Sequence, residues 1–291
     1  MNKGLGIKDL ETLSGVKAHT IRIWEKRHNI FDPQRTETNI RLYSNDDLKK
    51  LLNIATVLQH GMKISKVSTL SKDELNAEIE SLQKENFDAA QRIIINNLIV
   101  ATLQCHVADF QRKYSEYSKT HGIENTIENI IYPLLIRIGL MWTVSKLNPS
   151  QEHFASQMIR QKLFTAIDNL PEASSDEKFV LYLPENEDHE IGLLYSYYLI
   201  KKAGHECIYL GPSVPLKDVS ECVSNANAGQ VLCSFTIQRP EPVEKVYVEK
   251  MSEHFENRKV YIHGVSEKSA AKLNKPGLNF LHQINDLKNL L

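Results

Sequence analysis

The residues whose side chains are best suited to acid–base or metal chemistry lie in one short loop, ENEDHEIG. The loop contains His189, with Glu187 two positions before it and Gly192 three positions after it, and it follows an apolar run at residues 179–183. An imidazole titrates near neutral pH and can carry a proton or bind a metal. A solvated loop histidine has the same local sequence, so the elements around His189 must distinguish between these roles.

A second group combines an aromatic ring with a carboxylate and another imidazole. Trp142 is followed by nine residues and then by Glu152 and His153. These residues also fit the end of one helix and the exposed first turn of the next, where acidic side chains are favoured by the helix dipole. The pattern alone leaves both interpretations open.

A third group is basic and lies near the N-terminus. Residues 7–13 predict a short helix that ends at Gly15, and residues 17–27 predict a second helix, which together form a helix-turn-helix pattern. Outward-facing Arg, Lys and Thr side chains can read base edges or hold phosphates. The candidates on the second helix are Lys17, His19, Thr20, Arg22, Glu25, Lys26 and Arg27. A solvated charged helix is the alternative for this segment alone.

The elements that must position His189 alternate along the last part of the chain. Five β-rich runs occur at residues 179–183, 207–211, 230–236, 259–265 and 278–282, with helical runs between them. Apolar strands that alternate with helices predict a parallel sheet covered on both faces. We expect a flavodoxin-like (Rossmann-type) domain, in which ligands bind beyond the carboxyl ends of the strands. The His189 loop follows the first strand and therefore lies at that edge.

The chain before this domain is helical in pattern. Short helices with polar turns fill residues 1–75, and residues 76–174 predict a four-helix bundle, with a capping-box start at Ser71 and Glu74. The predicted fold class is multidomain α and α/β, with domains at 1–75, 76–174 and 175–291.

The composition is that of a globular chain, with 42% hydrophobic and 24% charged residues among 291. Residues 1–66 contain 12 Lys and Arg against 7 Asp and Glu, whereas the rest contains 23 against 29. A basic head fits nucleic-acid binding. Because no apolar run suits a membrane helix and no signal peptide is visible, we expect a cytoplasmic protein without membrane contact. The four cysteines form no CxxC pair, and we expect buried, reduced thiols.

The N-terminal residues resemble the MerR family of DNA-binding regulators. The resemblance rests on the T-I-R-x-W-E run at residues 20–25, the Pro-x-Arg turn at 33–35, and Arg41-x-Tyr43. It implies a winged helix-turn-helix domain that binds double-stranded promoter DNA, usually as a dimer on a two-fold operator. It also implies that Arg41 and Tyr43 of the wing contact the DNA backbone, and Arg35 joins them as a DNA-binding candidate.

The ENEDHEIG loop resembles the cobalamin-binding signature of corrinoid proteins, in which an acidic residue, His and Gly have this spacing. Forty-one residues separate Gly192 from Ser234, and 27 residues separate Thr236 from Gly264, each element following a predicted strand. Thr236 replaces the leucine of the family, and Val265 replaces its second glycine. We expect the Val265 side chain to crowd the slot for the nucleotide tail of the cofactor.

This resemblance implies a role for each residue of the signature. His189 is expected to be the lower ligand of the cobalt, with Glu187 holding the other ring N–H. The remaining positions are expected to line the cofactor site: Gly192, Ser234, Thr236 and Gly264.

A Trp-x9-Glu-His pattern upstream of a cobalamin domain resembles the light-sensing regulators of the CarH/LitR type. The order of the three domains is also theirs. The resemblance implies that Trp142 packs against the upper ligand, that Glu152 hydrogen-bonds its sugar, and that His153 is the upper ligand after photolysis. Adenosylcobalamin suits these contacts better than methylcobalamin does. Methylcobalamin stays open as the alternative cofactor. We expect a repressor whose dark, cobalamin-loaded form is a dimer or tetramer.

Three other interpretations stay open. A MerR-type regulator that has lost its cofactor would be controlled by protein–protein contact. An enzyme, such as a corrinoid methyl carrier or a mutase subunit, shares the C-terminal domain but has no use for residues 5–75, so we expect no catalytic residues. A redox or metal sensor of the MerR type lacks the cysteine cluster it needs.

Overall fold

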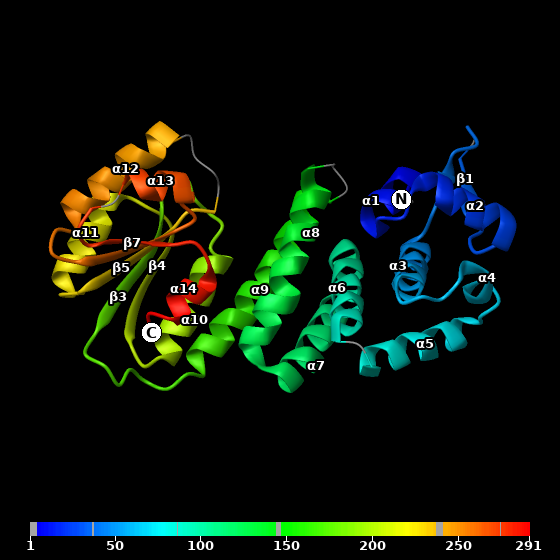
Figure 1. Ribbon diagram of the computed structural model, residues 1–291, viewed down its shortest axis with the longest axis horizontal. Coiled ribbons are helices and arrows are strands. Elements are labelled where there is room, and N and C mark those ends of the chain that lie inside the picture. The colour runs from blue at the N-terminus through cyan, green and yellow to red at the C-terminus, as the bar shows by residue number, and fades with distance from the viewer. Residues whose placement is uncertain (1–4, 37, 86, 144–146, 237–240, 274) are drawn as a thin grey trace. The chain divides into compact units, whose positions relative to one another are not determined.

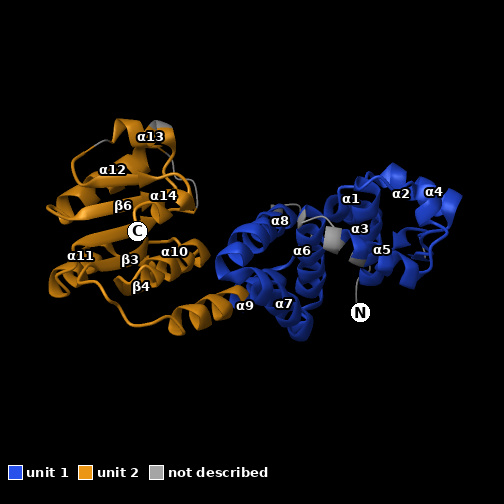
Figure 2. Ribbon diagram, turned by 60° about the horizontal axis from the view of Figure 1, so that its bottom comes forward, with its two compact units in different colours: residues 1–158 blue, residues 159–291 orange. Residues whose placement is uncertain are grey.

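The computed structural model describes residues 5–36, 38–85, 87–143, 147–236, 241–273 and 275–291. The chain forms two compact units, residues 1–158 and residues 159–291, which Figure 2 shows in different colours. The first unit is helical apart from one small hairpin, and the second carries a five-stranded sheet. Of the helices in this described part, none combines the length and apolar character needed to cross a bilayer.

The first unit begins with the predicted winged helix-turn-helix (Figure 1). Its elements are helices α1 (Ile7–Ser14) and α2 (Ala18–His28), the antiparallel strands β1 (Gln34–Arg35) and β2 (Arg41–Leu42), and helices α3 (Asn45–Gln59) and α4 (Ile64–Val67). Gly15 ends α1 with a φ of 73°, a left-handed value that glycine adopts at little cost. Ser44 caps α3 through a reciprocal pair with Asp47. Ser71 and Glu74 form the predicted capping box in front of the next helix.

The rest of the first unit consists of longer helices. They are α5 (Lys72–Glu85), α6 (Phe87–Gln104), α7 (Val107–Thr126), the π-helical turn η1 (Ile127–Ile131), α8 (Tyr132–Thr143) and α9 (Pro149–Asp168). Gln151 fastens the start of α9, because its Nε2 donates to the Leu103 carbonyl at 2.7 Å. Phe154 meets Phe110 edge-on at 5.8 Å between ring centres. Helices α6 to α9 therefore form the bundle, and α9 continues past residue 158 into the second unit.

The prediction of four buried thiols was wrong. Cys233 is buried, whereas Cys207 and Cys222 are half-buried and Cys105 is exposed. Cys105 lies in the connection between α6 and α7, and connections of this kind run over the surface. Burial raises the pKa of the Cys207 thiol to about 12, so this side chain is inert at neutral pH.

The second unit confirms the flavodoxin-like prediction. Its elements are β3 (Lys178–Pro184), α10 (Ile191–Lys202), β4 (Glu206–Val214), α11 (Leu216–Asn225), β5 (Gln230–Ser234), α12 (Glu241–His254), β6 (Lys259–His263), α13 (Glu267–Lys272), β7 (Leu278–Leu281) and α14 (Ile284–Lys288). The strands are parallel and lie in the order β4-β3-β5-β6-β7. The chain leaves β3 toward β4 and then crosses to β5 on the other side, so the switch point lies beside the carboxyl ends of β3 and β5.

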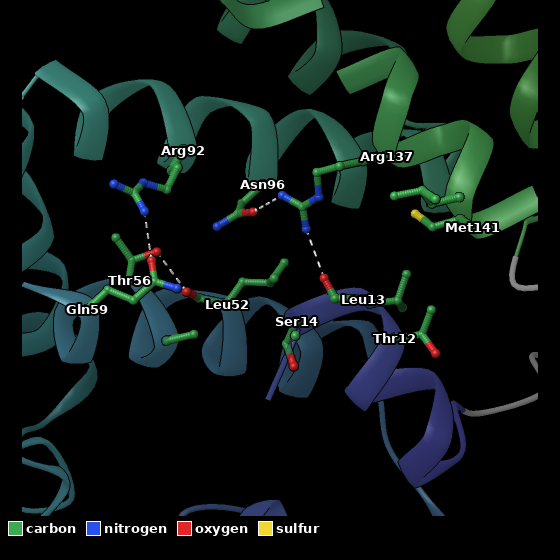
Figure 3. A pocket seen from close by; sticks show the side chains of 13 residues that line it. Thr12, Leu13, Ser14, Leu52, Thr56, Gln59, Arg92, Asn96, Arg137 and Met141 are labelled. Carbon is green, nitrogen blue, oxygen red and sulfur yellow. Dashed lines mark hydrogen bonds between the residues drawn. The ribbon is translucent and has the colours of Figure 1, made fainter. Parts of the chain in front are cut away.

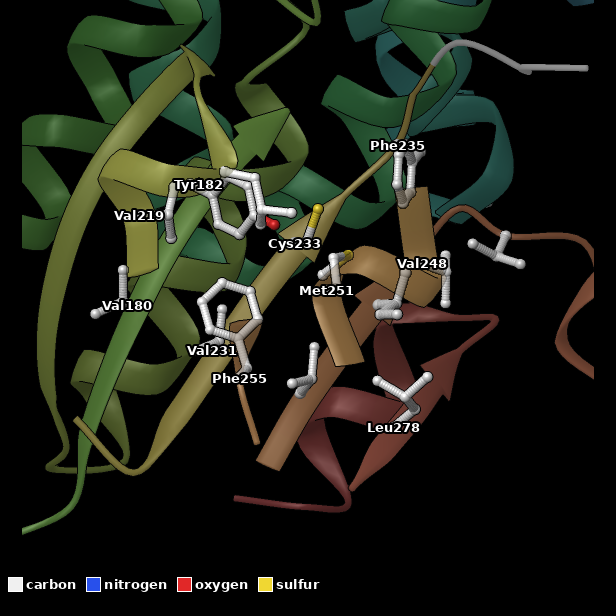
Figure 4. Packing of buried hydrophobic residues seen from close by; sticks show 14 of the residues in the cluster. Val180, Tyr182, Val219, Val231, Cys233, Phe235, Val248, Met251, Phe255 and Leu278 are labelled. Atoms are coloured by element: carbon white, nitrogen blue, oxygen red, sulfur yellow. The ribbon is translucent and has the colours of Figure 1, made fainter. Parts of the chain in front are cut away.

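The core of the second unit explains why these strands are uninterrupted apolar runs. Every residue of β5 is buried, and so is all of β3 except its first residue, because helices cover the sheet. Figure 4 shows Val180 and Tyr182 of β3, Val231 and Cys233 of β5 and Met251 of α12 in one buried cluster. Burying one such side chain contributes about 1.5–3 kcal/mol, so this packing fixes the strand ends that carry the loops.

Candidate functional site

The His189 loop joins the end of β3 to the start of α10. Asn186 adopts a left-handed φ of 63°, and its N–H donates to Ser213 Oγ at 3.1 Å. The Glu187 carbonyl accepts from the Ser213 N–H at 3.1 Å, and the Glu187 N–H donates to the Pro184 carbonyl at 3.0 Å. Because Ser213 lies on β4, these bonds fasten the loop to the neighbouring strand at the predicted ligand-binding edge.

Within the loop, the imidazole of His189 is held by a buried carboxylate. His189 Nδ1 lies 2.8 Å from Glu187 Oε1, and the His189 N–H donates to the same oxygen at 3.2 Å. A carboxylate only accepts hydrogen bonds, so Nδ1 carries the proton. The Glu187 side chain has no exposed surface, whereas 59% of the His189 side chain is exposed. The arrangement therefore presents Nε2 with its lone pair toward solvent.

Thr236 completes the support of Glu187. The Thr236 N–H donates to Glu187 Oε2 at 3.0 Å, and Thr236 Oγ1 donates to the His189 carbonyl at 3.2 Å. Both carboxylate oxygens are thus satisfied, as a buried charge requires. Thr236 therefore ties the loop after β5 to the loop after β3 through its hydroxyl. The corrinoid family has leucine, which lacks a hydroxyl, at this position.

Gly264 is required by the close approach of two loops. Its φ is 88°, and a Cβ built on it would lie 1.8 Å from the Phe235 carbonyl oxygen. The Phe235 N–H also donates to the His263 carbonyl at 2.9 Å. Ser234 is buried, with Oγ 3.4 Å from His263 Nδ1, and burial lowers the pKa of His263. The ends of β5 and β6 therefore lie against each other beside the His189 loop.

Gly192 and Val265 differ in their surroundings. A Cβ on Gly192 would meet no atom within 4 Å, so this glycine leaves open space at the start of α10. Val265 is 4% exposed and belongs to the core cluster of the second unit. Packing accounts for a valine at this position, and its predicted crowding of the slot stays a prediction.

The donor set of this edge fits a corrinoid cobalt. A ligating histidine needs a neutral ring, a free nitrogen and a partner on the other nitrogen. His189 has an exposed side chain and, in Glu187, a partner on Nδ1. Among the described residues, no group of three or more His, Cys, Asp or Glu could hold a metal by itself. His189 would contribute one nitrogen ligand to a metal that a cofactor holds.

The second predicted constellation lies at one end of the bundle in the first unit. Trp142 lies on the last turn of α8, and 48% of its surface is exposed. Glu152 and His153 lie on the first turn of α9, with His153 Nδ1 2.9 Å from Glu152 Oε2. The structure therefore leaves an indole, a carboxylate and a largely exposed imidazole at the end where α8 leads to α9.

The predicted DNA-contacting residues of α2 are mostly accessible. Thr20 is half-buried, and the others are exposed: Lys17, His19, Arg22, Lys26 and Arg27. Lys17 pairs with Glu11 at 3.3 Å. In the wing, Arg35 is exposed and its Nη1 donates to Asn39 Oδ1 at 2.8 Å. This surface offers cations and a hydroxyl to a nucleic acid.

Tyr43 and Glu25 do not face outward, and these two predictions were wrong. Tyr43 has no exposed surface, and its hydroxyl donates to Glu25 Oε2 at 2.9 Å. Arg41 Nε donates to Glu25 Oε1 at 2.8 Å, and this hydrogen bond raises the pKa of Arg41. Burial, followed by the Glu25 hydrogen bond, raises the pKa of Tyr43. The wing therefore uses Glu25 to fasten itself to the recognition helix, and Arg41 remains a DNA-binding prediction.

Glu190 is a candidate that sequence reasoning missed. Its carboxylate is buried, pairs with Arg160 Nη2 at 2.5 Å and accepts from the Tyr209 hydroxyl at 2.5 Å. Burial, and then this hydrogen bond, raise the pKa of Tyr209. The residue after His189 thus ties the loop to α9 and to β4. Its partners lie far away in sequence, so no local pattern could have revealed them.

Two profiles of known protein families match parts of this chain. The profile of the MerR HTH family regulatory proteins matches residues 5–74, and that of the B12 binding domain matches residues 94–166, which lie on helices α6 to α9. The chain is a MerR-type transcriptional regulator with a B12-binding domain. As such a regulator, it binds DNA and is not an enzyme.

Individual relatives give the same picture at a distance. The HTH-type transcriptional repressor CarH of Myxococcus xanthus is 26% identical over 216 residues, which cover 72% of each chain. CarA of the same organism is 25% identical over 239 residues, covering 81% of this chain and 77% of CarA. The monomethylamine corrinoid protein of Methanosarcina barkeri superposes with a TM-score of 0.55 at 15% identity, over 68% of this regulator and 96% of that chain. This last likeness concerns the fold alone.

Proposed function

We propose that this regulator is a light-responsive repressor that uses adenosylcobalamin as chromophore and as the switch of its assembly state. The observation that carries the proposal is the His189 imidazole, which a buried carboxylate holds with Nε2 exposed. The repressor names of CarH and CarA support the sign of regulation.

The second unit supplies the lower side of the site. His189 Nε2 is the proposed cobalt ligand, and Glu187 keeps the proton on Nδ1. Thr236 holds Glu187 in place, and Ser234 and Gly264 border the edge that accepts the nucleotide tail. Gly192 leaves the open space that a bound group needs. Bound adenosylcobalamin supplies a cobalt–carbon bond that visible light can break.

The first unit supplies the proposed upper side. The exposed Trp142 indole offers an apolar surface to the adenosyl group, and Glu152 offers an acceptor for its sugar hydroxyls. His153 is the second candidate ligand, and its contact with Glu152 leaves Nε2 as the free nitrogen. In this proposal these first-unit residues respond to the upper group, and a ligand that binds one state better than another biases a conformational equilibrium.

Assembly is the proposed output. Two linked DNA-binding domains bind a two-fold operator far more tightly than one such domain does, although neither domain makes a new contact. A ligand that favours the oligomer therefore favours occupied promoter DNA, and its loss in light releases the gene.

Size-exclusion chromatography coupled to a DNA-binding assay tests this proposal. Protein loaded with adenosylcobalamin should elute as a dimer or tetramer in the dark and as a smaller species after illumination, and it should lose promoter DNA in parallel. Protein loaded with hydroxocobalamin is the matched control, because it lacks the photolabile alkyl group.

Unchanged elution and unchanged DNA binding after illumination would reject the photosensor function. A protein that stays colourless with added cobalamin, yet binds DNA, would instead support a regulator controlled by protein–protein contact. The predicted crowding by Val265 is the specific reason to include that outcome.

A further inference from the structure

A cavity of about 290 Å³ lies within the first unit, between the DNA reader and the bundle. Its lower wall comes from α1 and α3, and its upper wall from α6 and α8 (Figure 3). This volume approaches the range of about 300–1,000 Å³ that small-molecule sites occupy and exceeds the roughly 30 Å³ of one water several-fold. A compact organic molecule fits this space.

The lining of the cavity has one sign of charge. Arg92 and Arg137 both belong to it, and none of its described lining residues is Asp or Glu. Figure 3 shows both guanidinium groups projecting from the upper wall toward the lower one. Among the described residues, Arg137 has no carboxylate partner, and burial lowers its pKa. A half-buried guanidinium without an anion is costly, because a charge taken from water needs compensation.

The hydrogen bonds that Arg137 makes use only part of its donor groups. Its Nη1 donates to Asn96 Oδ1 at 2.6 Å, and its Nη2 donates to the Leu13 carbonyl at 2.8 Å. Leu13 lies in the last turn of α1, so Arg137 also meets the negative end of that helix dipole. A guanidinium has five N–H groups, so donors remain for a ligand.

Asn96 adds a donor between the two arginines. It is 8% exposed, and its Oδ1 is turned to Arg137, which places its amide N–H₂ on the opposite side, toward Arg92 (Figure 3). No described residue accepts a hydrogen bond from that amide group. Arg92 and Asn96 are one helical turn apart on α6, so their side chains share a face. Arg92 Nη1 donates to Gln59 at 3.0 Å and keeps other N–H groups.

We propose that this cavity binds a small organic dianion through Arg92, Asn96 and Arg137. Guanidinium groups match the paired oxygens of phosphates and carboxylates, so the ligand is a phosphate monoester or a short dicarboxylate. The apolar part of the lining, which includes Leu52 and Met141, accepts a short carbon chain. Because the walls belong to the reader and to the bundle, the ligand bridges these parts and forms a second input to DNA binding, independent of the cobalamin site.

Isothermal titration calorimetry of the full-length, cobalamin-free protein tests the site. The probes are glycerol 3-phosphate and succinate, titrated at constant ionic strength in chloride. Wild-type protein should bind one equivalent of one probe saturably. Tighter binding of the phosphate assigns a phosphate monoester, and tighter binding of succinate assigns a dicarboxylate.

Two variants remove the proposed contacts while preserving the fold. Asn96→Asp keeps an oxygen for Arg137 but brings a negative charge into the cavity, and Arg92→Gln removes one cation from an exposed position. Loss of a charge-assisted contact is worth about tenfold or more in affinity, so each variant should raise the Kd at least about tenfold. Arg112→Gln, an exposed arginine on α7 outside the cavity, should bind like wild type.

Two results would overturn the proposal. One is the absence of saturable binding of either probe below about 10 mM, a concentration that corresponds to a free energy of binding of about 3 kcal/mol. The other is equal affinity in wild type and Asn96→Asp. Either result would mean that Arg137 only joins α1 to the bundle through its hydrogen bond to Leu13.

Discussion

Replacement of Glu187 by glutamine is the most informative single change at the proposed cobalt ligand. The carboxylate accepts hydrogen bonds from the His189 ring at 2.8 Å, the His189 N–H at 3.2 Å and the Thr236 N–H at 3.0 Å. Glutamine has nearly the same shape but only one accepting oxygen, because its other terminal atom is an N–H₂ group. The change therefore replaces one acceptor by a donor without creating a cavity.

Either orientation of the new amide disturbs the site. If its N–H₂ faces His189, the ring must accept on Nδ1 and carry its proton on Nε2, which is then unable to ligate a metal. If its N–H₂ faces Thr236, two donors oppose each other in a buried position, which costs about 1–3 kcal/mol. Loss of such a partner of a ligating histidine typically lowers metal affinity by about 10–100-fold, or about 1.4–2.7 kcal/mol.

Absorbance titration of the cobalamin-free protein with adenosylcobalamin in the dark measures this loss. We expect Glu187→Gln to raise the Kd by about 10–100-fold and to change the spectrum of the bound form. Asp188→Asn is the matched control, because Asp188 is the exposed neighbour in the same loop and should bind like wild type. A Glu187→Gln protein with wild-type affinity and spectrum would refute the assignment of Glu187 as the partner of a ligating histidine.

Three further predictions concern stability. Gly264→Ala should lower the free energy of unfolding by at least about 2 kcal/mol in denaturant titration, because its φ is 88° and its Cβ would meet the Phe235 carbonyl; Gly229→Ala, with open space around the Cβ, should cost far less. Tyr43→Phe should cost about 1.5–3 kcal/mol through the lost hydrogen bond to Glu25, and it should leave the DNA affinity of the folded protein unchanged, because Tyr43 is buried. Burial lowers the pKa of His263, so the unfolded chain binds a proton near pH 6.5 that the folded chain does not yet bind. The free energy of unfolding should therefore fall as the pH drops below that value. A His263→Gln protein whose stability has the same pH dependence as the wild type would contradict this prediction.

The sheet could be predicted because its signal is local. Each strand of the second unit is a short apolar run between turn residues, and the period of strand and helix fixes a parallel, doubly wound topology. The position of His189 at the carboxyl edge followed from that topology. Its orientation also depends on Glu187, which is close enough in sequence to be recognised in the same motif.

What could not be predicted depends on contacts between distant residues. Tyr43 was expected on the DNA side, yet it is buried because Glu25, 18 positions earlier, accepts its hydroxyl. Arg137 bonds to a carbonyl 124 positions away, and nothing in either segment marks that pair. Glu190 lies beside the most informative histidine, but its partner on α9 becomes visible only when the two segments meet.

The central claim is that His189 holds the cobalt of a bound corrinoid. Electron paramagnetic resonance of the reduced, cobalt(II) form tests it most directly, because the axial nitrogen splits the cobalt lines. Protein labelled with nitrogen-15 histidine should show doublets where unlabelled protein shows triplets, and His189→Ala should lose this change. Triplets that persist in the labelled protein would show that the axial nitrogen belongs to the cofactor itself, and this account of the site would then be wrong.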